Sequence, residues 1–248
     1  MDFVLNADQL ELKQAAHAWL ADRFPLDRDW EHQDTRWGEI KELGWLDVAE
    51  AGLGFVEEAL LLEEMGYVCH PGFYLGVIGP VPSEGVLPTV DPSRRFHPVE
   101  ETPRIRAAAA AEALGVAQRA LDLGVEHAKT RVQFGKPIGT YQAVSHPLAQ
   151  TYTDVELARS LVYWAAWCVA EEDERAPLAA AAAKAFATEA AVAACERSIQ
   201  AHGGIGFTWE HPLHRFYKRA IWLEGFGRRP AELRLEVADA VLGVRVGE

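Results

Sequence analysis

The stretch RAAAAAEALGVAQRALDLGVEHAKTR, residues 106–131, carries the clearest structural signal in this sequence. Its larger apolar side chains recur every three or four residues, which is the spacing of one face of an α-helix. That face holds Leu114, Ala117 or Gln118, Leu121, Val125 and Ala128. Alanine occupies many of the other positions, and small side chains let neighbouring helices approach closely. The stretch therefore predicts a long helix inside a helical bundle.

Shorter helices are expected before this stretch. Apolar residues at helical spacing indicate helices over residues 7–23, 35–44 and 55–66. Asp8 is a candidate N-cap for the first, and Gly44 and Gly66 are interpreted as C-terminal stops for the other two. These helices predict an N-terminal helical domain over residues 1–85.

The composition changes between residues 79 and 103, where GPVPSEGVLPTVDPSRRFHPVEETP is rich in proline and has no helical period. We interpret residues 86–105 as a short linker. Since no other part of the chain has a β-compatible composition, the expected strand content is very low.

Residues 106–248 are predicted to form a C-terminal helical bundle domain. The helices expected after the first long one cover residues 145–173, 177–204 and 230–243. Ser145 is the candidate N-cap of the second long helix, and Pro147 lies in its first turn, where the missing N–H costs nothing. The third ends at Gly203-Gly204. The predicted fold class is all-α.

Composition excludes several functional classes. The 248 residues carry a formal net charge of -13, which argues against a surface that binds nucleic acid. Three widely separated cysteines favour neither a disulfide framework nor a cysteine-based zinc site. The N-terminal residues do not resemble a secretory signal, and no window reaches the apolar length of a membrane span. We expect a cytoplasmic protein.

General catalytic signatures are absent from the sequence. GGIGFTW and AGLGFVEE contain Gly-x-Gly pairs but lack the third glycine of a dinucleotide fold, so their glycines are interpreted as helix stops. No histidine follows a glutamate at the spacing of a di-iron bundle. His211 and His214 have the spacing of helical metal ligands, but we interpret them as surface residues, and no metal site is expected.

Two short segments do carry chemistry. In KTRVQFGKPIGTYQAVSHPLAQ, the basic residues Lys129, Arg131 and Lys136 surround Phe134-Gly135, and such a turn can present donors to a phosphate. The alternative is a solvated loop between helices. In RAIWLEGFGRRP, Glu224 lies among apolar residues that raise a carboxyl pKa, as for a general base. The alternative there is an ordinary helix end.

These segments carry a family resemblance. The motifs RVQFGKPIGTYQAV, IQAHGGIGFTWEHPLHRFYKRA and LEGF, in this order and spacing, resemble the C-terminal helical domain of the acyl-CoA dehydrogenases over about residues 106–245. ALLLEEMGYVCHPGFYLG resembles the end of that family's N-terminal helical domain. The resemblance implies a flavoenzyme fold and the oxidation of an acyl-CoA thioester to its α,β-enoyl form, with FAD taking a hydride.

The resemblance also implies roles for individual residues. In the family, the Arg-x-x-Phe-Gly turn reaches the pyrophosphate of an FAD held by a neighbouring subunit, and the Gln-x-x-Gly-Gly turn meets the same nucleotide. The matching residues are Arg131, Gln133 and Phe134 in the first turn, and Gln200, Gly203 and Gly204 in the second. Glu224 occupies the place of the catalytic base.

The sequence departs from the family pattern where a subunit holds its own flavin. Phe226 replaces a Thr or Ser that contacts this FAD, and a phenyl ring cannot donate the hydrogen bond. A whole β-domain normally separates the two helical parts, whereas here only Val86 to Arg104 is available, with DPSRRFHPVE resembling the tail of that domain. So short a segment cannot form a β-barrel.

We therefore hypothesise a partner subunit of an acyl-CoA dehydrogenase, in which FAD is shared with or held by a full-length homologue. The assembly would be a hetero-oligomer such as a heterotetramer, acting on an acyl-CoA in lipid or steroid metabolism. The alternatives are a stand-alone flavoenzyme of the same reaction, a flavin-free acyl-thioester lyase or isomerase that uses Glu224, and a purely structural subunit.

Overall fold

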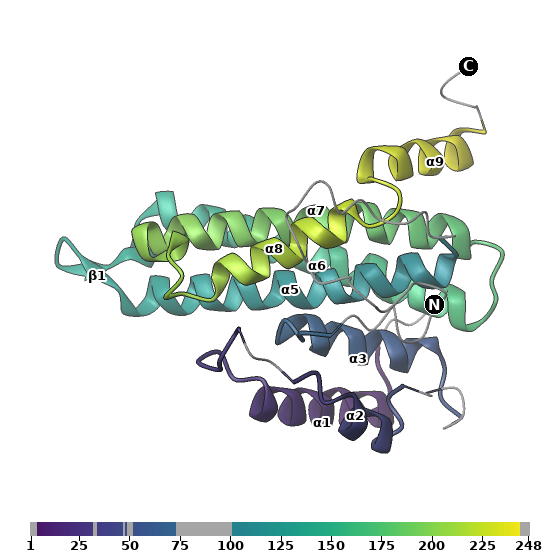
Figure 1. The fold of residues 1–248 in the computed structure, drawn as a ribbon. Helices are drawn as coiled ribbons and strands as arrows, with labels where there is room; N and C mark the ends of the chain where they lie inside the picture. Colours follow the sequence, from purple (N-terminus) through teal and green to yellow (C-terminus); the bar gives the residue numbers. More distant parts are fainter. Residues whose placement is uncertain (1–3, 32–33, 47, 49–51, 73–100, 244–248) are drawn as a thin grey trace.

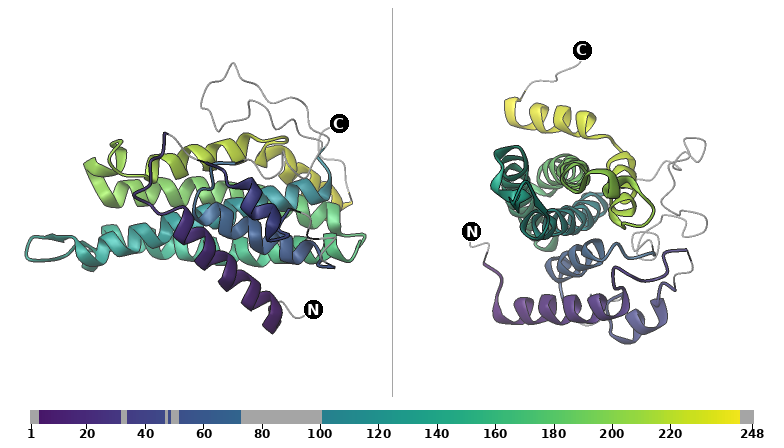
Figure 2. Two further views of the ribbon diagram at one scale, coloured as in Figure 1. Left: turned by 60° about the horizontal axis from the view of Figure 1, so that its bottom comes forward. Right: turned by 90° about the vertical axis from the view of Figure 1, so that its left-hand side faces the viewer.

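The computed structural model describes residues 4–31, 34–46, 48, 52–72 and 101–243. The described part is almost entirely helical, which confirms the predicted all-α class. Three helices form a layer against one side of a bundle of long helices (Figures 1 and 2). The proposed boundary near residue 85 and most of the expected linker lie outside the described residues.

The N-terminal layer consists of α1 (Ala7–Arg23), α2 (Trp37–Glu42) and α3 (Phe55–Tyr67). Helix α1 has the predicted bounds, but its N-cap is Asn6 and not Asp8. Asn6 Oδ1 accepts a hydrogen bond from the Gln9 amide at 2.8 Å, and Gln9 Oε1 accepts one from the Asn6 amide at 3.0 Å. This reciprocal capping box fixes the start of the helix at Ala7.

The bundle is built from α5 (Pro103–Thr130), α6 (Gln142–Ala170), α7 (Ala176–His202) and the shorter α8 (Leu213–Gly225). Helix α9 (Pro230–Leu242) lies against α7 at the outside (Figure 1). Gly203 and Gly243 end α7 and α9 with φ values of 66° and 65°, as predicted for glycine stops.

The start of α6 was predicted wrongly. The helix begins at Gln142 with Tyr141 as N-cap, so Ser145 lies inside it and donates its Oγ hydrogen to the Tyr141 carbonyl at 3.2 Å. Pro147 therefore lies beyond the first turn and removes one backbone hydrogen bond. The 3-10 turn Ile138–Thr140 leads the chain into the helix, which therefore starts earlier than the position of Pro147 in the sequence suggested.

The strands in the described part form a small hairpin between α5 and α6. Strand β1 (Val132–Gln133) pairs antiparallel with β2 (Lys136–Pro137). The prediction that only the linker is β-compatible is therefore wrong at this turn, because a tight reversal of the chain imposes extended backbone on a few residues whatever their propensity.

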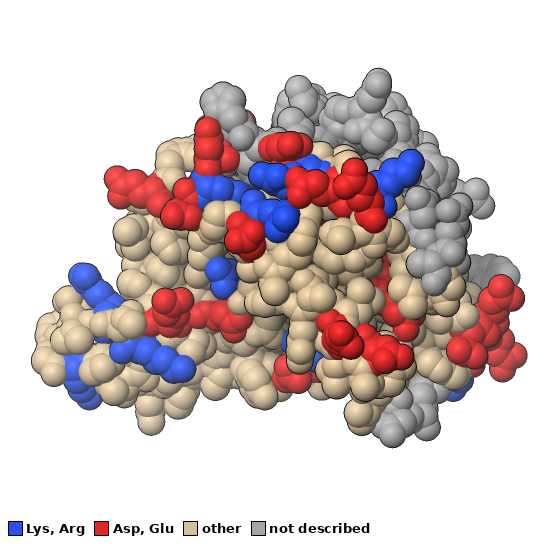
Figure 3. Space-filling view, turned by 90° about the horizontal axis from the view of Figure 1, so that it is seen from below, with Lys and Arg blue, Asp and Glu red and all other residues tan. Residues whose placement is uncertain are grey.

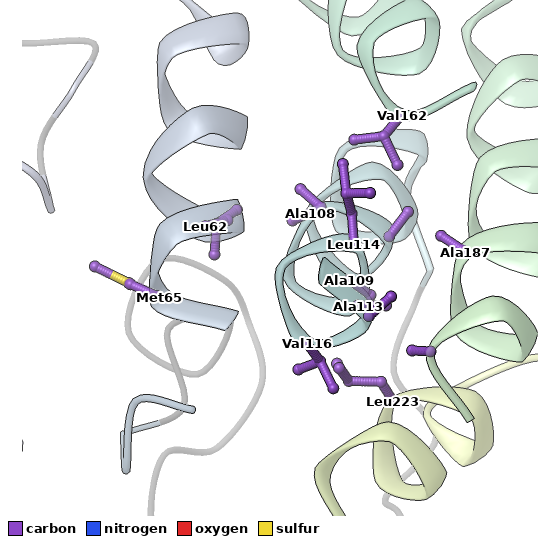
Figure 4. Packing of buried hydrophobic residues seen from close by; sticks show 14 of the residues in the cluster. Leu62, Met65, Ala108, Ala109, Ala113, Leu114, Val116, Val162, Ala187 and Leu223 are labelled. Atoms are coloured by element: carbon purple, nitrogen blue, oxygen red, sulfur yellow. The ribbon is translucent and has the colours of Figure 1, made fainter. Parts of the chain in front are cut away.

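Helix α5 is the centre of the molecule. It lies between α3 on one side and α6, α7 and α8 on the other, and its residues 105–117 are all buried. Figure 4 shows Leu114 and Val116 of α5 between Leu62 of α3 and side chains of the other bundle helices. A helix buried on all sides needs small residues, because interhelical distance depends on the side chains at the contact.

The closest approach in this core joins α3 to α5. A Cβ added at Gly66 would lie 2.1 Å from the Glu112 carbonyl oxygen, and one at Gly115 would lie 1.8 Å from that of Glu63. Gly66 lies within α3, which continues to Tyr67, so its interpretation as a helix stop is wrong. Both glycines let the two helix backbones come into contact. In a single sequence, a glycine with this role looks the same as a glycine that ends a helix.

A buried carboxylate joins the same two layers. Glu63 on α3 is 3% exposed and accepts hydrogen bonds from Lys13 Nζ at 2.7 Å and from Tyr163 Oη at 2.8 Å. It also forms an ion pair with Arg159 of α6. A buried carboxylate is costly unless it is paired, so α1 and α6 are both required around α3.

The segment Ala176–Phe207, which begins with α7, contains an 18-residue window with the mean hydropathy of a membrane span, but 67% of that window is buried inside the protein. The helix packs against α5, α6, α8 and α9, with Ala181 and Ala185 next to Leu233 of α9, and it supplies Lys184, a buried cation. The composition of α7 thus reflects its interior position in the bundle.

Gly115→Ala should lower the free energy of unfolding by about 2 kcal/mol or more, because the added methyl overlaps backbone atoms of α3. The measurement is urea denaturation followed by circular dichroism. Gly38→Ala is the matched control: it also lies in a helix, but its Cβ meets nothing within 4 Å. That variant should be neutral or slightly stabilising. Equal stability of the two variants would contradict the close approach.

Candidate functional site

The segments that carry the two nucleotide motifs meet at one end of the bundle. His127 on the last turn of α5 stacks on His202 at the end of α7, with ring centroids 4.2 Å apart. His202 in turn lies 4.4 Å from His211, just before α8. The β1–β2 hairpin projects from this end (Figure 1). The structure thus brings the Arg131 and Gln200 segments close together within one chain.

The hairpin presents its motif side chains outwards. Arg131 follows α5 directly, and its side chain is exposed without a hydrogen bond to any described residue. Gln133 is exposed as well, and its amide donates only to the adjacent Val132 carbonyl at 2.8 Å. Phe134 is 93% exposed and has a φ of 52°, next to Gly135 at 80°. Left-handed backbone is rare for a bulky residue and is typical of turns or functional sites.

The second motif lies at the end of α7. Gln200 is exposed on the last turn, and Gly203 and Gly204 follow it at the surface. Gly203 needs its positive φ to end the helix. Gly204 has neither a positive φ nor any atom within 4 Å of an added Cβ, so nothing in the described chain requires glycine there. A glycine of this kind is expected where another molecule approaches the backbone closely.

This end of the molecule is suited to an anionic nucleotide. The Arg131 guanidinium and the Gln200 amide supply donors, and Lys129 and Lys136 add positive charge in a chain whose net charge is -13. In Figure 3 the projecting end, at the left, shows basic groups among uncharged ones. A guanidinium fork and open backbone groups match the oxygens of a pyrophosphate. The cross-subunit elements of a flavin site are therefore compatible with these residues.

Glu224 lies in a different part of the molecule. It is on the last turn of α8, eleven residues after Leu213, which is roughly 16 Å along the helix at 1.5 Å per residue. Its side chain is half-buried, and burial, followed by Glu189 and Glu196 nearby, raises its pKa. The carboxyl is therefore a better base than an exposed one, but it is remote from the hairpin end.

The turn after Glu224 is anchored in the core by Phe226, whereas Gly227, Arg228 and Arg229 are exposed. Phe226 is 1% exposed and stacks on Trp222 with centroids 5.3 Å apart. The buried Lys184 ammonium donates to the Phe226 carbonyl and, at 3.1 Å, to that of Arg228, and it forms an ion pair with Glu101. Phe226 therefore presents no side-chain donor at the surface, and it does not fit the role of the hydroxyl residue that contacts a subunit's own flavin.

Two features of these sites were missed at the level of sequence. The histidine stack joins residues from three separate segments, and Lys184 appears in the sequence only as one cation in an alanine-rich helix. Neither has a local signal. Among the described residues, no group of three or more His, Cys, Asp or Glu side chains is arranged to hold a metal ion.

Comparison with known proteins agrees with the motif order. The family description "Acyl-CoA dehydrogenase, C-terminal domain" matches residues 100–227, more than half of the chain. This chain belongs to the acyl-CoA dehydrogenase family. The acyl-CoA dehydrogenase IpdE2 of Mycobacterium tuberculosis is 43% identical over 144 residues, covering 53% of this chain and 43% of that protein. The probable acyl-CoA dehydrogenase YngJ of Bacillus subtilis is 41% identical over 140 residues, covering 55% and 36%.

The aligned part of this family member spans less than half the length of those relatives. Solved structures of the same fold include butyryl-CoA dehydrogenase from Megasphaera elsdenii, with a TM-score of 0.79, 19% identity and coverage of 98% of this chain and 100% of that one. The ChsE4-ChsE5 complex from Mycobacterium tuberculosis has a TM-score of 0.77, 20% identity and coverage of 99% and 100%. At such identities the similarity shows a shared fold.

Phe134→Asn should raise the free energy of unfolding by between about 0.5 and 1 kcal/mol, because asparagine tolerates left-handed backbone better than phenylalanine. Chemical denaturation of the isolated chain measures it. Glu172→Asn is the control, since Glu172 has a φ of 50° in the exposed turn after α6. A gain at Glu172 combined with a loss at Phe134 would mean that the phenyl ring stabilises its own chain.

Proposed function

We propose that this chain is a subunit of an FAD-dependent acyl-CoA dehydrogenase and completes the flavin site of a full-length partner subunit. One observation carries the proposal. The donors that the family lends to a neighbour's flavin are exposed together at one end, while in the turn that would hold the chain's own flavin Phe226 is buried and its carbonyl is bound by Lys184. The chain can thus contribute to a flavin site without containing one.

In this role the residues of the chain bind and orient the cofactor. FAD, when bound, supplies the acceptor for the hydride that leaves the β-carbon of an acyl-CoA thioester. Arg131 would hold the pyrophosphate through its fork of donors, and Gln200 would donate its amide to the same nucleotide. Gly203 and Gly204 would let the nucleotide approach the backbone, and Phe134 would cover it from water. The base that takes the α-proton would come from the partner.

Exposed apolar side chains around the same end support a protein interface. The side chains in question are Val132, Phe134, Ile205, Phe207 and Trp209, and the last three follow the Gln200 turn. Trp209 is 71% exposed. Clustered exposed aromatic residues are typical of surfaces that a partner covers. The interface and the nucleotide would then share one end of the bundle.

Relatives of the same fold suggest the kind of assembly. One solved structure is described as a complex of two proteins, ChsE4 and ChsE5, and another as the Tcur3481-Tcur3483 steroid acyl-CoA dehydrogenase. Both descriptions pair unlike chains. We therefore infer a hetero-oligomer acting on an acyl-CoA in lipid or steroid breakdown.

The test is co-expression of this chain with a full-length acyl-CoA dehydrogenase encoded nearby, followed by native mass spectrometry. The expected species contains both chains and bound FAD. A colourless homomer that ignores every such partner would overturn the proposal, as would a homomer that retains FAD through repeated gel filtration.

A lyase or isomerase that uses Glu224 is the second candidate. The raised pKa of Glu224 favours it, and one relative, 37% identical over 143 residues, is the 3-sulfinopropanoyl-CoA desulfinase of Paraburkholderia xenovorans. In that case the chain alone would turn over an acyl thioester without flavin. Glu224→Gln would then abolish the activity.

Arg131→Ala should weaken FAD retention by the co-purified complex by about tenfold or more, because a charged hydrogen-bond donor to phosphate is lost. Flavin absorbance after ultrafiltration measures it. Lys129→Ala is the matched control, an exposed cation two residues earlier, and should change retention less than threefold. Equal losses for Arg131→Ala and Lys129→Ala would indicate a general charge effect.

Glu224→Gln should leave the activity of the complex intact, because the base would come from the partner.

A further inference from the structure

Three histidine rings join the segments of the proposed nucleotide site. The rings of His127 and His202 lie at an interplanar angle of 24° with centroids 4.2 Å apart. The ring of His211 lies against that of His202, with centroids 4.4 Å apart and an interplanar angle of 49°. His127 is one helical turn before Arg131, and His202 directly precedes Gly203. The rings are thus a direct contact between the α5 end, the α7 end and the approach to α8.

Hydrogen bonds fix the proton at one nitrogen in each of two rings. His202 Nδ1 lies 2.8 Å from the Ser198 carbonyl, so this nitrogen carries a proton and donates. His211 Nδ1 lies 3.3 Å from the Leu213 amide, so it accepts and has no proton. His211 is therefore neutral, and its second ring nitrogen is a donor. The bond of His202 forms in both the neutral and the charged ring, so the charge of His202 depends on its surroundings.

The surroundings of the stack disfavour additional positive charge. Burial, followed by His202 and Arg131, lowers the pKa of His127. Burial, followed by His202, His127 and His214, lowers the pKa of His211 to about 4. Burial also lowers the pKa of His202. Besides one another, the side chains that act on the three rings are those of Arg131, which acts on His127, and His214, which acts on His211.

We propose that His127, His202 and His211 are positioning residues whose neutral stack holds the Arg131 hairpin and the Gly203-Gly204 turn together, and that acidification opens it. Only the statement that the site takes a flavin nucleotide rests on the proposed function. None of the side chains that shift the pKa values of the three rings is a carboxylate that could neutralise added protons. Protonation of adjacent rings therefore places like charges in contact.

The direction of the pH effect follows from linkage. A histidine whose pKa is lower in the closed state than its ordinary value of about 6.5 binds protons preferentially when the stack is open. The closed state is therefore fully favoured above pH 6.5 and loses stability as the pH falls below it. Each titrating ring can contribute about tenfold per pH unit in this range.

Hydrogen exchange of the isolated chain at pH 7.5 and 5.2 tests this proposal. After correction for intrinsic exchange, peptides from the ends of α5 and α7 and the start of α8 should lose protection by about tenfold or more at pH 5.2. Peptides from residues 105–117 report on global unfolding and should change less than threefold. His127→Phe keeps a ring in the stack but cannot titrate, so its response should shrink at least threefold.

His146→Phe is the matched control, because His146 is exposed on α6 and outside the stack, and it should keep the full response. Unchanged protection in the wild type, or the same loss in His127→Phe, would overturn the proposal. If His127→Phe does not fold, ring NMR titration of the wild type decides: coupled curves with midpoints below the ordinary value of about 6.5 are expected, and independent curves at that value contradict it. Neither measurement uses FAD or a partner, so a failed co-purification leaves this test intact.

Discussion

The structure depends on one steric constraint, the burial of α5 on every side. A helix with neighbours all round has room for few large residues, and where α3 crosses it Gly66 and Gly115 bring carbonyl oxygens of the opposite helix within about 2 Å of where a Cβ would stand. The alanines of residues 107–111 extend this close packing along the helix. Because α5 cannot move independently of either layer, its far end holds the hairpin at a fixed place relative to the bundle.

That rigidity explains how functional groups are distributed. The end that carries Arg131 and Gln200 is open to a visiting molecule, and its side chains have few partners within the chain. The turn that carries Glu224 and Phe226 is occupied from within by the ammonium of Lys184. One bundle thus combines exposed donors at one end with a turn whose Phe226 is part of the core.

Much of the fold could be predicted from sequence because it rests on local periodicity. The bounds of α1, the glycine ends of α7 and α9 and the position of the hairpin motif follow from helical spacing and stop signals. Gly66 and Ser145 were misinterpreted because their roles depend on which helix or turn lies beside them. The histidine stack could not be inferred, since it is made by residues 127, 202 and 211 that only the tertiary fold brings together.

Lys184 also has a consequence for how the chain closes on itself. Its ammonium binds carbonyls at Phe226 and Arg228 and the carboxylate of Glu101, joining the entrance of α5 to the segment between α8 and α9. Phe226 and Arg228 are close in sequence, but Glu101 and Lys184 are far from them and from each other. The lysine therefore has all its partners only when these distant segments have come together. Such non-local contacts cost loop-closure entropy and stabilise the chain only when all the partners are in place. A chain cut before Phe226 would leave the buried Lys184 ammonium without its two carbonyl partners, and an incompletely paired buried charge is costly.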